Sequence, residues 1–507
     1  MTKRIFENGV IRTMADAVTS AAWVMTEGGR IVDLGTHAPS IDGVERVDLQ
    51  GRTVVPGFID PHGHFPESGL NTVCRMDVST GGPGALVNLR DVLEKIAMPP
   101  LGDWVLAMGF DHTALVEGRF PTAQELDSVQ PDRPVWLLHV SGHAGVLNSA
   151  GMARMGISGD GYLAGIDAMG DLGSTDFGID DEGLAQGTQE AAREYVSHGV
   201  TLAHNAWLES RLLDRMIMLD QEGGLPLDLI GLPAAELEPG FSSSLPAGLK
   251  RLILGPRKLF ADGAFQVQTA FLSKPYHQPA NDDPDWRGMR YTTPEELRAD
   301  IKRLHEAGHQ IHIHTNGDGA SDDALDAFEA ALRDMPRNDH RHTLIHGQAL
   351  RDDQLDRMAR LEISVSFFSA HVHFWGEKHR DVFLGPERAA RINPARSAID
   401  RGIRITIHND APVTPTRPLH LMWCAVARET SAGSVLGPEQ RITPEEALRA
   451  HTIDAAWQVF QDHDRGSIES GKRADFAVLS DDPITTSKAI KDIQVEKTII
   501  LGETVAP

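Results

Sequence analysis

The sequence predicts an α/β protein: a (β/α)8 TIM barrel with a small β-sandwich domain built from both termini and an α+β subdomain inserted after the first strand. The barrel is indicated by eight short β-branched runs that alternate with amphipathic stretches through the middle of the chain. The β domain is indicated by the two chain ends, where short apolar runs are separated by glycine and show no helical period. A chain of 507 residues has room for about three units of roughly 150 residues each.

The expected barrel strands are apolar and bounded by turn residues, and they cover residues 53–59, 200–205, 226–232, 257–261, 310–314, 342–346, 363–367 and 404–408. The helices expected between them have apolar residues at helical spacing and cover residues 182–198, 209–222, 294–307, 322–334, 352–361 and 386–401. The interval 236–249 is a poor helix because Pro239 and Gly240 interrupt it.

The same pattern gives the domain boundaries. We expect residues 1–55 and 465–507 to form the β-sandwich domain and residues 56–464 to form the barrel. The interval from about 66 to 181 is far longer than one crossover helix and has strand-like runs of its own. We therefore expect it to form the inserted subdomain beside the mouth of the barrel.

Composition and charge disfavour several classes of function. Lys and Arg number 48 and Asp and Glu number 72, so the formal charge is −24, which disfavours nucleic acid and anionic membranes as partners. The two cysteines, Cys74 and Cys424, give no disulfide framework. The first residues contain no apolar run of the signal-peptide kind. We expect a cytoplasmic protein with a small-molecule substrate, compatible with a homo-oligomer.

Candidate metal ligands lie at five of the expected strands. His62 and His64 are two residues apart in PGFIDPHGHF, so on an extended chain both imidazoles face the same side. Polar residues at the carboxyl ends of barrel strands point into the mouth, where barrel enzymes carry out their chemistry. A single histidine at a strand end is more often a core residue than a ligand, and it is the ordered set that predicts a metal centre. The set is His62, His64, Lys258, His314, His346 and Asp410.

With these residues the sequence resembles the amidohydrolase superfamily of metal-dependent hydrolases, most closely the branch of N-substituted formamide deformylases and YtcJ-like proteins. The sequence departs from the pattern at Pro61 and at His408-Asn409, where relatives carry a small pair such as Gly-Ser before the aspartate. The resemblance covers nearly the whole chain, with motifs NGVI at 8–11, GRI at 29–31, PGFID at 56–60, GH at 142–143, NS at 148–149, KLFADG at 258–263, GD at 317–318, LGPER at 384–388, DAPV at 410–413 and GSIESGKRAD at 466–475.

The resemblance implies a site for two divalent metal ions, with zinc as the expected metal. His62, His64 and Asp410 would hold the more buried ion, and His314 and His346 the more exposed one. Carbamylated Lys258 would bridge the two ions, since a carbamate offers anionic oxygens where an ammonium group would repel a cation. Two alternatives are open for Lys258. It is either a lysine with a buried stem and a charge at the surface, or an unmodified lysine at a site that holds a single metal ion.

The implied reaction is hydrolysis of a C–N bond in a linear amide of the N-formyl or N-acyl amine type. A metal-bridging hydroxide would attack the carbonyl, and Asp410 would act as the catalytic acid and base. One alternative is a single-metal deaminase or a cyclic-amide or carbamate hydrolase on the same scaffold, and esters cannot be separated from amides by sequence. A further alternative is a catalytically silent binding protein.

Substrate-facing residues are expected around the metal site. His143 of the insertion is a candidate for a hydrogen bond to the substrate, although a histidine that caps a local turn explains the motif equally well. Phe368, His371 and Trp375 follow the seventh strand and are expected to line the pocket. Trp207 fits either the pocket or the core. Three aspartates have expected supporting roles: Asp318 behind His314, and Asp60 and Asp262 as structural residues.

Overall fold

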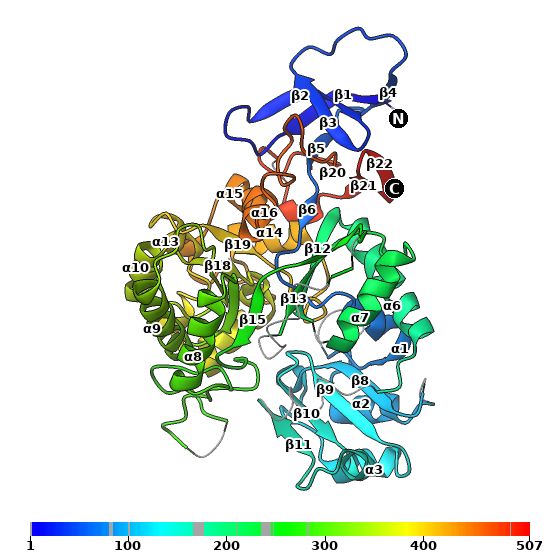
Figure 1. The fold of residues 1–507 in the computed structure, drawn as a ribbon. Coiled ribbons are helices and arrows are strands. Elements are labelled where there is room, and N and C mark those ends of the chain that lie inside the picture. The colour runs from blue at the N-terminus through cyan, green and yellow to red at the C-terminus, as the bar shows by residue number, and fades with distance from the viewer. Residues whose placement is uncertain are drawn as a thin grey trace.

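The structure, a computed structural model, describes residues 3–80, 85–99, 102–165, 177–208, 210–234, 245–246, 248–280, 283–486 and 488–506. It contains a terminal β sheet, a set of parallel strands with surrounding helices, and an inserted sheet (Figure 1). Both chain ends lie at the terminal sheet. Within these ranges no helix combines the length and the apolar character needed to cross a lipid bilayer.

The expected barrel strands, together with the short strand β14 that was not expected, form two parallel sheets (Figure 1). One has four strands in the order β14-β13-β12-β6, which are Leu252–Leu254, Asp228–Pro233, Val200–Leu208 and Phe58–Ile59. The other has five strands in the order β15-β16-β17-β18-β19, which are Arg257–Phe260, Ile311–Thr315, Thr343–His346, Ser364–Phe367 and Ile405–Ile407. Most of their residues are buried, as is usual for parallel strands that helices cover.

The two parallel sheets meet at a bridge between Ala234, just beyond β13, and Lys258 of β15. On the other side, the backbone N–H of Asp410 donates to the carbonyl of His62 at 3.0 Å, so the segments after β19 and β6 are in contact. Among the described residues no ladder joins β19 to β6. The parallel order of the strands is therefore observed, and the closure of the barrel stays a prediction.

The first expected strand, 53–59, consists of two strands in different sheets. β5 (Thr53–Pro56) pairs within the terminal sheet, whereas β6 belongs to the parallel strands. Gly57 separates them, and a Cβ atom at this position would lie 2.4 Å from the side chain of Thr201 on β12. The close approach of the backbone to β12 therefore requires glycine, and it marks the point where the chain passes from one sheet to the other.

Amphipathic helices connect the parallel strands. They are α6 (Asp181–Ser197), α7 (Ser210–Gln221), α8 (Pro294–Glu306), α9 (Asp318–Asp334) and α10 (Asp352–Leu361). The helix expected over 386–401 is instead two short helices, α12 (Pro386–Ala389) and α13 (Ala395–Ile399), because Pro394 interrupts it. The interval 236–249 falls largely outside the described residues.

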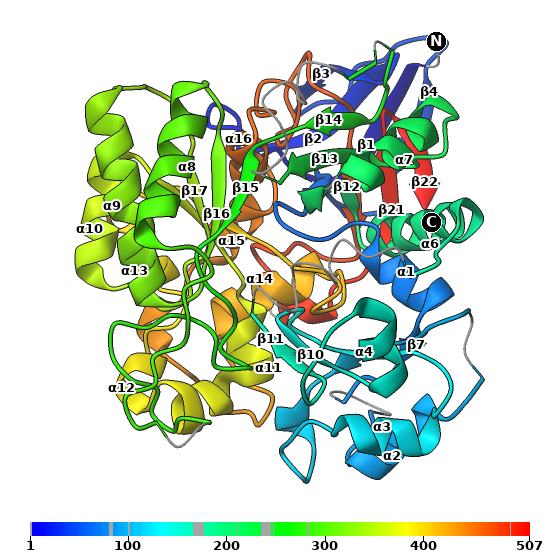
Figure 2. The same cartoon turned by 60° about the horizontal axis from the view of Figure 1, so that its bottom comes forward.

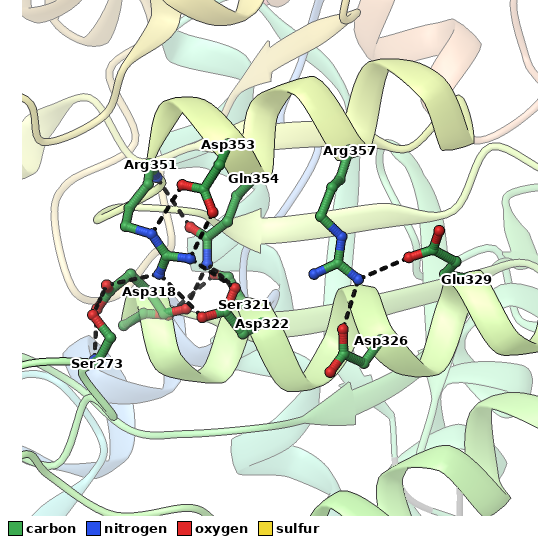
Figure 3. A network of polar contacts seen from close by, with 11 residues as sticks. Ser273, Asp318, Ser321, Asp322, Asp326, Glu329, Arg351, Asp353, Gln354 and Arg357 are labelled. Carbon is green, nitrogen blue, oxygen red and sulfur yellow. Dashed lines mark hydrogen bonds and ion pairs between the residues drawn. The ribbon is translucent and has the colours of Figure 1, made fainter.

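A network of polar side chains joins α9 to α10 (Figure 3). Arg351 precedes α10, and its guanidinium donates to Asp318 and Asp322 of α9 and to Asp353, each at 2.9 Å. The amide of Gln354 also donates to Asp322 at 2.7 Å. One guanidinium thus binds three carboxylates and fixes the start of α10 against the start of α9.

The terminal sheet contains strands from both chain ends, in the order β22-β21-β20-β5-β1-β2-β3 with β4 beside β1. The N-terminal half of β1 pairs with β4 and its C-terminal half with β5, so the sheet branches at β1. Whether it is a sandwich stays a prediction. Besides β5, the strands are β1 (Lys3–Arg12), β2 (Ser20–Glu27), β3 (Arg30–Gly35), β4 (Glu45–Asp48), β20 (Phe476–Leu479), β21 (Val495–Ile500) and β22 (Glu503–Ala506).

The insertion forms a separate sheet in the order β11-β10-β9-β8-β7, and both ribbon views place it beside the parallel strands (Figures 1 and 2). Its strands are β7 (Met76–Asp77), β8 (Val105–Phe110), β9 (Val135–His139), β10 (Ala144–Leu147) and β11 (Tyr162–Ala164). Its helices are α2 (Leu89–Ile96), α3 (Ala123–Val129) and α4 (Ser149–Met155), and α1 (Glu67–Cys74) leads into it.

The remaining helices follow β18 and β19. They are α11 (Ala370–Lys378), α14 (Pro418–Ala427), α15 (Pro444–Ala450) and α16 (Ile453–Gln458). Single turns of tighter or wider helix occupy His112–Ala114, His379–Phe383, Pro438–Gln440 and Ile490–Asp492. Figure 2 shows α11 near the insertion, and Trp375 of α11 donates a hydrogen bond to Asp111 after β8.

Candidate active site

The ends of the parallel strands position the predicted metal ligands. His62 and His64 follow β6, Lys258 lies on β15 and Asp410 follows β19; His314 and His346 lie on β16 and β17. His346 and Asp410 have left-handed backbone conformations, with φ of 71° and 54°. Residues other than glycine rarely adopt this conformation, and they do so more often at functional sites.

Short distances connect four of these side chains. His62 Nε2 lies 3.4 Å from Lys258 Nζ and 3.5 Å from Asp410 Oδ1. His64 Nε2 lies 3.4 Å from the same carboxylate oxygen. Ligand atoms of His62, His346 and Asp410 all lie within 4.8 Å of one another. The ring centroids of His314 and His346 are 4.6 Å apart, so the sixth side chain joins the same group.

Burial sets the charge state of these groups. It lowers the pKa of His62 and His346 well below the usual value, and that of His314 to about 3, so the imidazoles are neutral. Burial also lowers the pKa of Lys258 to about 7. For Asp410, burial alone would raise the pKa, but the adjacent His64 imidazole and nearby positive charge lower it below its usual range. This carboxylate is therefore ionised near neutral pH.

Asp262 lies behind His314, with Oδ1 3.2 Å from His314 Nδ1. Its carboxylate accepts hydrogen bonds from the backbone N–H groups of Phe271, Asn316 and Gly317. Burial nevertheless raises the pKa of Asp262 to about 8. An aspartate held by the backbone beside a histidine orients that imidazole.

The structure corrects the role expected for Asp318. This residue accepts hydrogen bonds from Ser273 and Arg351 and supports α9, whereas Asp262 is the aspartate beside His314. Both aspartates follow apolar strands, so sequence spacing alone does not distinguish them.

His408 supports a second histidine. Its Nε2 lies 3.1 Å from His346 Nδ1, and Ser366 Oγ lies 2.9 Å from its other ring nitrogen. The bulky residue before Asn409 and Asp410 therefore sets the orientation of His346 rather than facing a substrate.

The donor set fits a metal site. Neutral imidazoles, a carboxylate and a lysine of lowered pKa converge, and nitrogen and carboxylate ligands are those that zinc prefers. Asp410 Oδ1 is buried and has no hydrogen-bond partner among the described residues. A buried polar atom without a partner is unusual, and a cation beside this oxygen would satisfy it.

A cavity of about 940 Å³ opens over these residues, and all six predicted ligands line it. His143 and Trp375 line it as predicted, and so does Trp207. Phe368 and His371 are a correction: neither is among the lining residues, and both are buried, with the Phe368 ring stacked on His408. Both residues lie shortly after β18. Their side chains pack behind the cavity wall, which Trp375 forms one helical turn after His371.

Two contacts made by cavity-lining residues were not expected from the sequence. Trp375 Nε1 donates to Asp111 Oδ2 at 2.9 Å, which joins α11 to the inserted sheet. His143 Nδ1 lies 2.8 Å from Tyr291 Oη. Asp111 and Tyr291 lie in segments without a recognisable motif, and only the folded chain brings them beside Trp375 and His143.

Comparison with known proteins finds relatives along nearly the whole chain. The chain is 29% identical to an N-substituted formamide deformylase of Arthrobacter pascens, over 98% of this chain and 96% of that protein. It is 28% identical to the putative amidohydrolase YtcJ of Bacillus subtilis, over 99% of both. Its fold resembles the crystal structure of an uncharacterized metal-dependent hydrolase from Pyrococcus horikoshii, with a TM-score of 0.78 and 24% identity over 96% of this chain and 99% of that one.

The match to the amidohydrolase family extends over residues 45–506, which includes all six candidate ligands and the cavity. The chain therefore belongs to the amidohydrolase family and is a hydrolase.

Proposed function

We propose that this hydrolase cleaves the C–N bond of a linear amide, of the N-formyl or N-acyl amine type, at a site for two divalent metal ions. The observation that carries the proposal is that Lys258 and Asp410 both lie within 3.5 Å of His62 Nε2 on the wall of one cavity. The name of the relative from Arthrobacter pascens, an N-substituted formamide deformylase, supports the choice of amide for this chain.

In this proposal zinc is the metal. His62, His64 and Asp410 would hold one ion, and His314 and His346 would hold the other. Lys258, as a carbamate, would supply anionic oxygen ligands to both. Burial lowers the pKa of Lys258 to about 7, which makes the neutral amine available to add to carbon dioxide with loss of a proton.

Divalent ions held by these residues would supply a water molecule of lowered pKa and a Lewis acid for the substrate carbonyl. Asp410 is ionised and lies in the cavity wall, so its carboxylate accepts the proton of the attacking water and returns it to the leaving nitrogen. His143 donates a hydrogen bond to the carbonyl oxygen. Trp207 and Trp375 form apolar wall against which the rest of the amide packs.

The proposal includes the closed barrel, with the eight strands β6, β12, β13 and β15 to β19 around the site. It also includes the domain boundaries, with residues 1–55 and 465–507 as a β-sandwich, residues 56–464 as the barrel and about 66–181 as the insertion. The single bridge between Ala234 and Lys258 and the backbone contact of Asp410 with His62 support closure on the two sides.

Metal analysis combined with a panel of N-formyl and N-acyl amines tests this function. We expect two equivalents of metal per chain and release of free amine, with both lost on chelation and restored by zinc. The mass of Lys258 peptides from gently handled protein should show added carbon dioxide. His346→Ala should lose metal, whereas His463→Ala, which removes an exposed histidine, should keep it.

Other outcomes count against the proposal. One equivalent of metal with unmodified Lys258 would favour a single-metal deaminase or cyclic-amide hydrolase. A protein that binds no metal and releases no amine would contradict the proposal altogether.

A further inference from the structure

His143 occupies a position above the candidate metal ligands. It precedes β10 of the insertion, lines the cavity, and has its ring centroid 5.0 Å from that of His314. Only 7% of the residue is exposed. A buried imidazole at this place can present one ring nitrogen to a molecule bound in the cavity, and the hydrogen bond of the other nitrogen decides which tautomer it adopts.

That other nitrogen faces Tyr291. The phenol oxygen lies 2.8 Å from His143 Nδ1. The backbone N–H of Tyr291 donates to the carbonyl of Ala261, at the end of the strand that carries Lys258, at 2.9 Å. The ring is thus anchored to the parallel strands and reaches across to the insertion.

The neighbourhood of the phenol is closely packed. A Cβ atom on Gly263 would lie 2.4 Å from Tyr291 Oη and 2.1 Å from Thr269 Oγ1, so these two hydroxyl groups enclose a space that only glycine leaves free. Thr269 Oγ1 already accepts a hydrogen bond from the backbone N–H of Ala264 at 3.0 Å. The hydroxyl of Tyr291 is therefore held in place by its surroundings and not by His143 alone.

The direction of the hydrogen bond follows from the chemistry of the two groups. A phenol keeps its proton at neutral pH and can donate it, and a neutral imidazole offers one sp2 nitrogen as acceptor. This nitrogen is a better acceptor than the aliphatic hydroxyl of Thr269, which already accepts from the backbone. Tyr291 donating to Nδ1 leaves the imidazole proton on Nε2.

We propose that Tyr291 is a positioning residue that fixes His143 as the tautomer protonated on Nε2 and aligns this N–H as a hydrogen-bond donor to a carbonyl oxygen bound beside His314. The role of this N–H in turnover rests on the proposed amide hydrolysis. The assignment of the tautomer does not depend on it. A donor aligned before substrate binds stabilises the charge that develops on the oxygen during attack.

Tyr291→Phe tests the proposal because it removes only the hydroxyl. We expect kcat for a cleaved amide to fall by about tenfold or more, KM to stay unchanged, and metal content to stay at the wild-type level. In the background of His143→Gln, the same change should have no further effect on kcat, since the residue it positions is gone.

Tyr276→Phe is the matched control. Its hydroxyl is also buried and donates to a backbone carbonyl, that of Ala270, at 2.8 Å, so the variant loses a comparable hydrogen bond without touching His143. Its kcat should remain at the wild-type value. If kcat fell as far in Tyr276→Phe as in Tyr291→Phe, the effect would come from a general loss of structure, and the inference would be overturned.

Nitrogen NMR of protein with 15N-labelled histidine reads the tautomer without any substrate. The His143 signals are identified by their loss in His143→Gln. We expect the Nε2–H tautomer in the wild type and a mixture in Tyr291→Phe. An Nδ1–H tautomer in the wild type, or full kcat in Tyr291→Phe, overturns the inference. A wild type with this tautomer that cleaves no amide would contradict the proposed function and leave the positioning by Tyr291 supported.

Discussion

Asp410 illustrates at the scale of one residue how the fold prepares a reactive group. Its left-handed backbone places the carboxylate between His62 and His64, and Oδ1 lies 3.5 and 3.4 Å from their Nε2 atoms. The same oxygen is buried without a hydrogen-bond partner in the described part of the chain. A buried oxygen without a partner lowers the stability of the folded state. We expect to find one where the oxygen binds a cation or accepts a proton during the reaction.

Asp410→Asn should separate the binding role of this residue from its role in proton transfer. The amide keeps the size and one oxygen ligand but cannot accept a proton, so we expect most of the metal to remain and kcat to fall by about 10²-fold or more. Metal analysis and initial rates on the same preparation measure both effects. Asp77→Asn, which changes an exposed carboxylate lining the same cavity, is the control. Full activity in Asp410→Asn would refute the assigned role.

At the scale of single elements, charged side chains fix how helices meet their neighbours. Arg351 joins α9 and α10 through three carboxylates, as Figure 3 shows. At the opposite end of the parallel strands, Asp454 in the first turn of α16 lies between Arg404 (3.6 Å) and Arg449 (3.9 Å). The separations are longer than in the Arg351 network, so Asp454 is buried without close compensation.

This difference predicts a pH dependence of stability. Burial raises the pKa of Asp454 to about 6 from 3.8, so the folded state binds its proton more tightly than the unfolded state does. Protonated Asp454 therefore stabilises the folded state fully below pH 3.8. This stabilisation is lost as the pH rises through 6, which lowers the free energy of unfolding by about 3 kcal/mol. Asp454→Asn, which cannot ionise, should therefore have a higher Tm than the wild type at pH 8 and a similar one at pH 4.

Thermal unfolding between pH 4 and pH 8 measures this effect. Asp356→Asn, which changes an exposed carboxylate on α10, is the control and should leave the pH profile unaltered. Equal profiles for the wild type and Asp454→Asn would mean that the two arginines compensate the buried charge fully.

At the scale of the whole molecule, the parallel strands and the six candidate ligands follow from sequence because their signals are local. A short β-branched run that ends in a polar residue predicts both a strand and the place where its side chain points. The break between β5 and β6 is not local, since it depends on how closely Gly57 approaches Thr201. The partners of His143 and Trp375 are equally remote, 148 and 264 residues away along the chain.

The hydrogen bond from Trp375 to Asp111 is a contact between the insertion and the rest of the molecule, and its loss should loosen the insertion. Both residues are at least nine-tenths buried, so Trp375→Phe leaves a carboxylate oxygen without its donor at a cost of about 1–3 kcal/mol. We expect faster amide hydrogen exchange in β8 and β9 and no change in β20 and β21 of the terminal sheet.

Trp23→Phe is the matched control for Trp375→Phe, because the indole Nε1 of Trp23 is buried and has no hydrogen-bond partner among the described residues. That variant removes an indole from the terminal sheet without breaking a hydrogen bond, and exchange in β8 and β9 should stay at the wild-type rate. Equal exchange in wild type and Trp375→Phe would show that apolar packing alone, and not this bond, holds the inserted sheet over the cavity. The insertion would then depend on the contacts of the Trp375 ring, which the phenyl group largely preserves.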